Sequence, residues 1–284
     1  MKYIITLFLT LSYSVSLLAS ISNAEKNSLI KLHQQTAGEQ WKVKLDLSTP
    51  IETWYGVRIQ NDKVIAINLS NNNLNGNLPV ELIGLKNLEE LNLFKNKISG
   101  QIPNNIGQLK NLKELNLSFN KLSGSIPVSI CEITHLNKLM LFMNNLTGEL
   151  PSEIGNLKEL ETVSLFNNEL SGQLPVSLYD LKNLKQLILS SNKFSGYISW
   201  DIDNLSSLES LSLFDNNLNG QIPFNLVKLD NLKTLNLSYN SFSGMVPKAL
   251  AQKDDFNLTM LIETGVAFKM KVSDNEYGVL AVDE

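Results

Sequence analysis

The chain has 284 residues, 43% of them hydrophobic and 18% charged, which is enough apolar material for a substantial core. Its formal charge of −4 argues against a nucleic-acid-binding protein, which needs a basic surface to displace counterions from phosphate. Its single cysteine, Cys131, excludes an internal disulfide framework.

Residues 1–24 are predicted to be a signal peptide. They contain one charge, Lys2, then a long apolar run, then small residues. Ser22 and Ala24 satisfy the small-x-small requirement of signal peptidase, which predicts cleavage after Ala24. A membrane anchor is the alternative, but serines interrupt the run and it is short for a bilayer span. Cys131 lies too far away to be a lipidated N-terminus, and no later segment predicts membrane insertion. We therefore expect a secreted or periplasmic protein.

Residues 25–63 are predicted to form an N-terminal cap. The segment 25–38 has the pattern of a short amphipathic helix, with Leu29, Ile30 and Leu32 facing inward and His33 on the same helix. A cap is expected here because the open end of a repeat structure would otherwise expose its core to water.

Residues 64–250 contain eight repeats with a constant period of 24. Glycine recurs at this spacing from Gly76 to Gly244, and asparagine recurs four positions earlier from Asn72 to Asn240. A proline stands three positions after the glycine in every repeat but one, which has Ser199 instead. Such regularity predicts a solenoid of stacked coils.

Each recurring residue has a physical role in such a coil. Leu91 and Leu93 alternate with polar residues, which is typical of a short strand with one buried face. The repeated asparagine predicts an internal ladder of hydrogen bonds to backbone groups at the turn that follows the strand. Glycine allows backbone conformations that a side chain would forbid, and proline fixes φ on the far side of the coil.

The consensus LxxLxLxxNxLxGxIPxxIGxL resembles the leucine-rich repeat family in its 24-residue, plant-type variety. The resemblance implies an α/β-type solenoid, mostly parallel β with a 3₁₀ or irregular convex side, and a helical cap before the first repeat. Trp54-Tyr55-Gly56-Val57 resembles the W-x-G-V motif of plant-type caps. Arg58 and Ile59 stand where plant secreted members usually carry a cysteine, which resembles the disulfide-free caps of bacterial members.

Residues 251–284 leave the repeat pattern and are predicted to form a C-terminal cap. Val266, Phe268, Met270 and Val272 alternate with other residues beside a polar turn, which predicts a β-hairpin or a short strand closing the last repeat.

No catalytic, metal or cofactor site is expected. The spacing of His, Cys, Asp and Glu fits no metal site, and the glycines are spaced for turns and not for phosphate. Cys131 and His135 could form a nucleophile pair, but no third group recurs nearby to orient them. The sequence therefore predicts a protein that is not an enzyme.

The variable positions on the concave face of the strands are the candidate binding surface. The position that follows each strand is Ser70, Phe94, Ser118, Phe142, Phe166, Ser190, Phe214 and Ser238 in the eight repeats. Aromatic residues among polar ones are typical of a recognition surface. Packing between neighbouring strands is the alternative explanation. The predicted ligand-binding residues are Phe94, Lys95, Phe119, Met140, Phe142, Met143, Phe166, Phe214 and Tyr239. Tyr197 and Trp200, on either side of Ser199, are a secondary patch that loss of the consensus could also explain.

These features predict a secreted, monomeric binding protein that recognises an extracellular protein, peptide or glycan. An adhesive protein that contacts cell wall, matrix or ice is the alternative, and family resemblance alone suggests a third function, inhibition of a secreted hydrolase. The sequons beginning at Asn68, Asn116, Asn145, Asn204, Asn236 and Asn257 are interpreted as by-products of the repeat, with glycosylation as the alternative.

Overall fold

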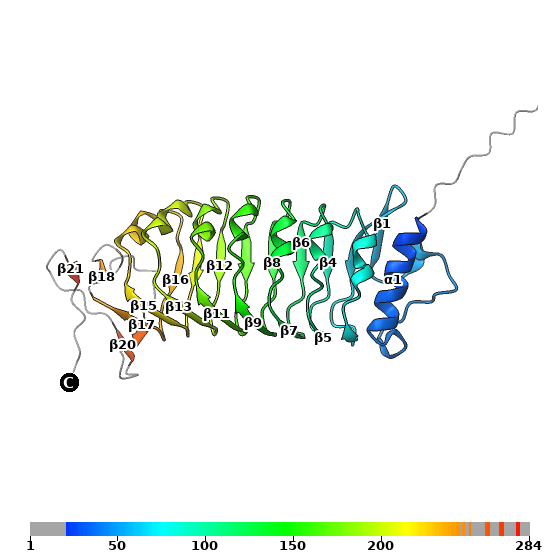
Figure 1. The fold of residues 1–284 in the computed structure, drawn as a ribbon, viewed down its shortest axis with the longest axis horizontal. Helices are drawn as coiled ribbons and strands as arrows, with labels where there is room; N and C mark the ends of the chain where they lie inside the picture. The colour runs from blue at the N-terminus through cyan, green and yellow to red at the C-terminus, as the bar shows by residue number, and fades with distance from the viewer. Residues whose placement is uncertain are drawn as a thin grey trace, which may run out of the picture.

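The computed structural model describes residues 21–244, 246–247, 250, 259–261, 267–269 and 277–278. The repeats stack side by side along the long axis of the molecule, with helix α1 (Asn23–Gln35) covering one end (Figure 1). Each coil supplies one strand to a first sheet, one strand to a second sheet, and a 3₁₀ segment between the second strand and the next coil. The predicted solenoid is confirmed, and its irregular side contains both short strands and 3₁₀ turns.

The first sheet has nine strands in the described part of the chain and is parallel after an antiparallel β1–β2 pair. Its strands, in spatial order, are β1 (Val57–Gln60), β2 (Lys63–Asn68), β4 (Glu90–Asn92), β6 (Glu114–Asn116), β8 (Lys138–Met140), β10 (Thr162–Ser164), β12 (Gln186–Ile188), β14 (Ser210–Ser212) and β16 (Thr234–Asn236). We call its outward surface, which corresponds to the predicted concave face, the nine-stranded face.

The second sheet is made of β3 (Asn75–Asn77), β5 (Lys97–Gly100), β7 (Lys121–Gly124), β9 (Asn145–Glu149), β11 (Glu169–Gln173), β13 (Lys193–Gly196), β15 (Asn217–Gln221) and β17 (Ser241–Ser243). The 3₁₀ segments are η1 (Gly38–Gln40), η2 (Ile51–Thr53), η3 (Val80–Gly84), η4 (Ile106–Gln108), η5 (Val128–Glu132), η6 (Ile154–Asn156), η7 (Val176–Asp180), η8 (Trp200–Asn204) and η9 (Phe224–Lys228).

The core lies between the two sheets and is continuous along the solenoid. Leu91, Leu115 and Leu139 are register partners on successive strands of the first sheet, and all three are fully buried. Because one coil cannot bury its apolar face alone, each coil obtains its burial from the coils on either side. The period of 24 therefore fixes both the register and the core.

The repeated asparagines form the predicted ladder inside this core. Asn144 Nδ2 donates to the carbonyl oxygens of Leu117 and Leu141, at 3.0 Å each, and its Oδ1 accepts the N–H of Leu122 at 3.0 Å. The same pattern recurs at Asn96, Asn120, Asn168, Asn192, Asn216 and Asn240. Each asparagine therefore links its own turn to the coil before it.

The N-terminal cap is attached through the first asparagine of the series. Asn72 Oδ1 accepts the N–H of Val43 at 2.7 Å, and Asn72 Nδ2 donates to the carbonyl of Val43 at 3.0 Å. In α1, Leu29 and Leu32 are buried as predicted, and Ile30 packs against the core while remaining half-buried. The cap thus continues both the core and the polar ladder.

Helix α1 begins before the predicted cleavage site. Ser22 is its N-cap and forms a capping box with Glu25. Glu25 is buried, and its Oε1 also accepts the N–H of Val64 at 3.1 Å. Cleavage after Ala24 would remove this cap and leave Glu25 at the new N-terminus. Cleavage there remains a prediction, as does the division of the chain into domains.

Beyond the repeats, the structure describes two short antiparallel pairs. β18 (Val246–Pro247) pairs with β21 (Tyr277–Gly278), and β19 (Thr259–Leu261) pairs with β20 (Ala267–Lys269). The predicted strand around Phe268 therefore pairs with an earlier segment, while Val266, Met270 and Val272 lie outside the described residues.

Ser199, the one departure from the proline position, has a specific partner. Its N–H donates to the hydroxyl oxygen of the buried Tyr179 at 3.1 Å, and its own hydroxyl accepts the N–H of Asp201 at 3.1 Å. A proline could form neither bond. The departure is therefore matched to Tyr179 in the previous coil, a position that glycine holds in two other coils, at Gly107 and Gly155.

Restoring the consensus with Ser199→Pro is expected to destabilise the protein by about 1 kcal/mol, because the buried Tyr179 hydroxyl loses its donor. The φ of −62° at Ser199 suits proline, so backbone strain does not contribute. Urea unfolding of Ser199→Pro, Tyr179→Phe and the double variant measures the coupling. If the two substitutions are additive, the hydrogen bond does not contribute to stability.

Candidate functional site

The nine-stranded face brings the predicted binding residues into two groups. The first, which we call the aromatic cluster, consists of Phe94, Phe119, Phe142 and Phe166. The second is the aromatic pair of Phe214 and Tyr239, whose ring centroids lie 4.9 Å apart. Ser190 occupies the position between the two groups in the series, so the predicted stripe is interrupted there.

Direct ring contacts connect the aromatic cluster. Phe142 and Phe166 are stacked with centroids 4.5 Å apart and an interplanar angle of 12°. Phe119 meets Phe94 at 5.3 Å and Phe142 at 5.5 Å, both edge-to-face. Phe94, Phe142 and Phe166 remain half-buried and Phe119 is exposed, so a continuous apolar surface faces solvent. Such pairs favour one another beyond simple burial, which means that the cluster is ordered without a ligand.

In all eight repeats, the residue that directly follows the position of Phe94 has a left-handed backbone. The φ values lie between 51° and 57° at Asn71, Lys95, Phe119, Met143, Asn167, Ser191, Asp215 and Tyr239. Asparagine and aspartate tolerate this conformation, whereas bulky side chains pay a cost of about 1 kcal/mol or more. Backbone hydrogen bonds to the next coil hold the conformation, as from Lys95 N–H to the Ser118 carbonyl at 2.9 Å. Phe119, Met143 and Tyr239 therefore occupy positions that backbone preference alone would not give them, as residues at functional surfaces often do.

Charged and sulfur-containing residues surround the aromatic cluster. Lys138 forms an ion pair with Glu114, and Arg58 lies 3.5 Å from Glu90, so the charges at this end of the face are partly neutralised. Met140 is half-buried on β8, and Met143 Sδ accepts a hydrogen bond from Asn167 Nδ2 at 2.6 Å. Lys95 is exposed beside Phe94. The cluster is therefore an apolar centre with a polar rim.

The other half of the face carries a group of hydroxyls that the sequence analysis did not single out. We call this group the hydroxyl patch: Thr162, Ser164, Ser190, Ser210, Ser212 and Thr234. Ser190 Oγ and Ser212 Oγ lie 2.6 Å apart, and Thr234 Oγ1 donates to Ser210 Oγ at 2.6 Å. The serine and threonine residues at the outward positions of β10 to β16 are the sequence signal that could have revealed the hydroxyl patch. Such a patch offers donors and acceptors to an extended polar ligand.

Asn92, one of the variable residues of this face, has a structural role. Its Oδ1 accepts the N–H of Phe94 at 3.1 Å, and Asn68, Asn116 and Asn236 do the same two residues before their own serines. The Asx turn gives three of the six sequon asparagines a structural role, and whether they are glycosylated stays open.

The predicted secondary patch lies outside the nine-stranded face. Tyr197 and Trp200 are 60% and 53% exposed, after β13 and at the start of η8, and Phe224 holds the position of Trp200 in the next coil. They therefore belong to the second-sheet side and do not join the aromatic cluster.

Cys131 and His135 do not have the properties of a nucleophile pair. The Cys131 side chain is buried, and burial together with Glu153 and Glu132 raises the pKa of its thiol to about 12. His135 is exposed, with Nδ1 2.9 Å from Glu159 Oε1. Since the thiolate is the nucleophile, a thiol with this pKa is unreactive near neutral pH.

The thiol of folded Cys131 is expected to react with iodoacetamide at pH 8 less than a hundredth as fast as in urea, because a raised pKa keeps the folded thiol protonated at that pH. Mass spectrometry of timed samples measures the two rates. Comparable rates would show that the site opens or that the thiolate is stabilised.

Within the described residues, no group of three or more His, Cys, Asp or Glu side chains is placed to hold a metal ion. Among the helices of that same part, none is both long enough and apolar enough to cross a membrane.

Family models match residues 128–254 (leucine-rich repeat region), 86–130 (leucine-rich repeats, two copies) and 63–85 (leucine-rich repeat). Comparison with curated protein sequences finds no match.

Solved structures are similar over most of the chain. The Arabidopsis receptor kinase HAESA, solved with the peptide hormone IDA and the co-receptor SERK1, is 30% identical, with 85% of this chain and 42% of that chain covered and a TM-score of 0.75. PEPR1, solved with AtPEP1, is 31% identical over 83% of this chain and 38% of that chain, with a TM-score of 0.73. A plant ice-binding protein is 25% identical over 80% and 89%, with a TM-score of 0.55.

The chain spans about two fifths of the length of the HAESA and PEPR1 chains. The family models together cover the repeats from residue 63 to residue 254, and the two parallel sheets follow the same period. The chain belongs to the leucine-rich repeat family.

Proposed function

We propose that this protein is a secreted, non-enzymatic receptor-like module that binds an extended extracellular peptide, free or within a protein, across its nine-stranded face. The observation that carries the proposal is the aromatic cluster, in which four rings joined by a chain of direct contacts remain open to solvent. Pre-ordered aromatic surface with a polar rim is typical of the energetic centre of an interface. The ligand's apolar side chains would cover the rings.

The hydroxyl patch supports a peptide in particular. It continues the face from β10 to β16, away from the charged pairs on β4, β6 and β8. An extended chain carries N–H and C=O groups at regular intervals and needs partners for those that it buries. The receptor kinase HAESA, described above, was solved with a peptide hormone, which favours the same ligand class here.

Capture experiments test the proposal. Immobilised wild type is exposed to native extracellular material beside a variant with Phe94, Phe142, Phe166 and Phe214 all changed to serine. The wild type is expected to retain peptides or proteins that the variant does not retain. Retention of the same partners by both would overturn the assignment to this face.

Adhesion to a repetitive surface such as ice is a second candidate, favoured by the hydroxyl patch and by the similar plant ice-binding protein. The protruding rings of the aromatic cluster and the ion pairs interrupt a flat regular array, so we rank it below peptide binding. Measurable thermal hysteresis in the wild type, retained when the four phenylalanines are replaced, would reverse this order.

A further inference from the structure

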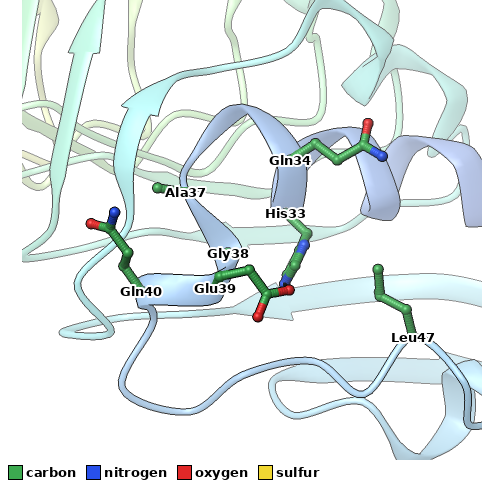
Figure 2. Close-up of a pocket in the computed structure, with 7 residues that line it drawn as sticks. All are labelled: His33, Gln34, Ala37, Gly38, Glu39, Gln40 and Leu47. Atoms are coloured by element: carbon green, nitrogen blue, oxygen red, sulfur yellow. Dashed lines mark ion pairs between the residues drawn. The ribbon is translucent and has the colours of Figure 1, made fainter.

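The N-terminal cap contains a pocket that is separate from the nine-stranded face. It has a volume of about 380 Å³ and lies where the end of α1 meets η1 (Figure 2). Its walls include Ala37 and Leu47, which are apolar, and Gln34 and Gln40, which present amides. In Figure 2 the imidazole of His33 and the carboxylate of Glu39 lie close together at the centre of this group.

His33 is held rigidly in this pocket. Its ring meets Trp41 edge-on at 5.1 Å, and the Trp41 indole N–H donates to the Thr36 carbonyl at 2.9 Å. The ring also lies against Gly38, where any Cβ would fall 2.1 Å from it. The glycine is therefore needed to make room for the imidazole.

The Nε2 atom of His33 has no hydrogen-bond partner, although the side chain is only 5% exposed. Buried polar atoms are nearly always paired, so an unpaired atom on a side chain that lines the pocket indicates a missing partner. The nearest candidate, Glu39 Oε1, is 3.9 Å away, which is too far for a direct bond. Glu39 itself is mostly exposed, and its other oxygen lies 3.7 Å from Lys44 Nζ.

The two facing atoms have the same polarity at neutral pH. Burial lowers the pKa of His33, outweighing the opposite effect of Glu39, and Lys44 lowers it further. A neutral imidazole can present a lone pair at Nε2, and the carboxylate is an acceptor as well. A group complementary to both acceptors carries positive charge and donates two hydrogen bonds from one atom.

We propose that this pocket binds a primary ammonium group on a short apolar chain, with the nitrogen between His33 Nε2 and Glu39 Oε1. A nitrogen can lie about 2.9 Å from both atoms at once, because their separation of 3.9 Å is less than twice that length. The carbon chain would then lie against the apolar part of the pocket lining, which includes Leu47. Alkylamines, lysine side chains and peptide N-termini share this chemistry.

Titration of the full chain with butylammonium chloride at constant ionic strength tests the proposal, with the His33 ring signals in NMR as readout. We expect saturable binding at pH 7.5 and at least tenfold weaker binding of butanol. Acetyl-lysine methylamide and leucinamide, run in parallel, distinguish a lysine side chain from a peptide N-terminus. Equal affinity for butanol and butylammonium would overturn the proposal.

Three exposed variants refine the test. Glu39→Gln is expected to weaken butylammonium binding at least tenfold, while Glu52→Gln, an exposed carboxylate of the same cap outside the pocket, leaves it unchanged. Lys44→Gln removes the competing ammonium and is expected to tighten binding. An equal effect of Glu39→Gln and Glu52→Gln would indicate nonspecific charge attraction and contradict the site.

The pH dependence of butylammonium affinity tests whether His33 accepts a hydrogen bond from the ligand or only shapes the pocket. Burial holds the pKa of His33 below the ordinary value of about 6.5, so the ring protonates only at more acidic pH, and its positive charge then repels the ammonium and attracts Glu39. We expect butylammonium affinity to fall at least fivefold between pH 7.5 and pH 5. Affinity that is constant or rises over this range would exclude His33 as an acceptor.

Discussion

Replacing Asn144 with alanine is expected to lower the free energy of unfolding by about 3 to 5 kcal/mol, one of the largest effects of any single polar substitution in the repeats. The change leaves the N–H of Leu122 without a partner. It also removes one of the two asparagine donors to each of two carbonyls, those of Leu117 and Leu141, which keep the bonds from Asn120 and Asn168. The buried N–H costs about 1 to 3 kcal/mol, and each of the two lost bonds about 1 kcal/mol more.

Asn104→Ala is the matched control, because Asn104 is an exposed asparagine outside the ladder. It is expected to change stability by no more than about 0.5 kcal/mol. Urea denaturation followed by circular dichroism measures both variants. A loss below about 1 kcal/mol for Asn144→Ala would mean that the turn rearranges to satisfy its own backbone.

The ladder is the part of the structure that the sequence predicted best, and the reason is the repeat itself. A residue that recurs at one place in every coil must meet its own copies, so the environment of Asn144 follows from the period. The same argument placed Leu91 and Leu115 on the core side of the first sheet. Eight copies of one pattern give eight independent observations of each position.

Contacts between non-equivalent residues could not be predicted in this way. The bond from Ser199 to Tyr179 joins two departures from the consensus, of which the sequence analysis noted only Ser199. His33 follows Leu29 by four residues, a spacing that puts both on one face of α1, so its burial was open to prediction. The orphaned state of its Nε2 depends on side-chain geometry that no spacing reveals.

The candidate binding surface was also only partly predictable. The period identified which positions face outward, and therefore selected Phe94, Phe142 and Phe166. Whether the rings contact one another depends on the left-handed turn that brings Phe119 between Phe94 and Phe142. The binding role of these residues stays a prediction.

Changing Phe142 to serine is expected to weaken binding of the captured ligand about 30-fold, equivalent to about 2 kcal/mol, as for a central aromatic residue of an interface. Phe166→Ser is expected to do the same. The double variant should lose less than the product of the two effects, because the rings are stacked on each other and either change disturbs both. Isothermal titration calorimetry with the purified ligand gives the three affinities.

Folding is not expected to limit this test, because serine already occupies the same position at Ser118, Ser190 and Ser238. Phe214→Ser is the matched control: the position is equivalent, but the ring contacts Tyr239 and lies outside the aromatic cluster. A discrete ligand centred on the cluster should tolerate this change within about threefold. If all three single variants instead weaken binding by similar small factors, the whole face contributes equally and the protein is an adhesin for a repetitive surface.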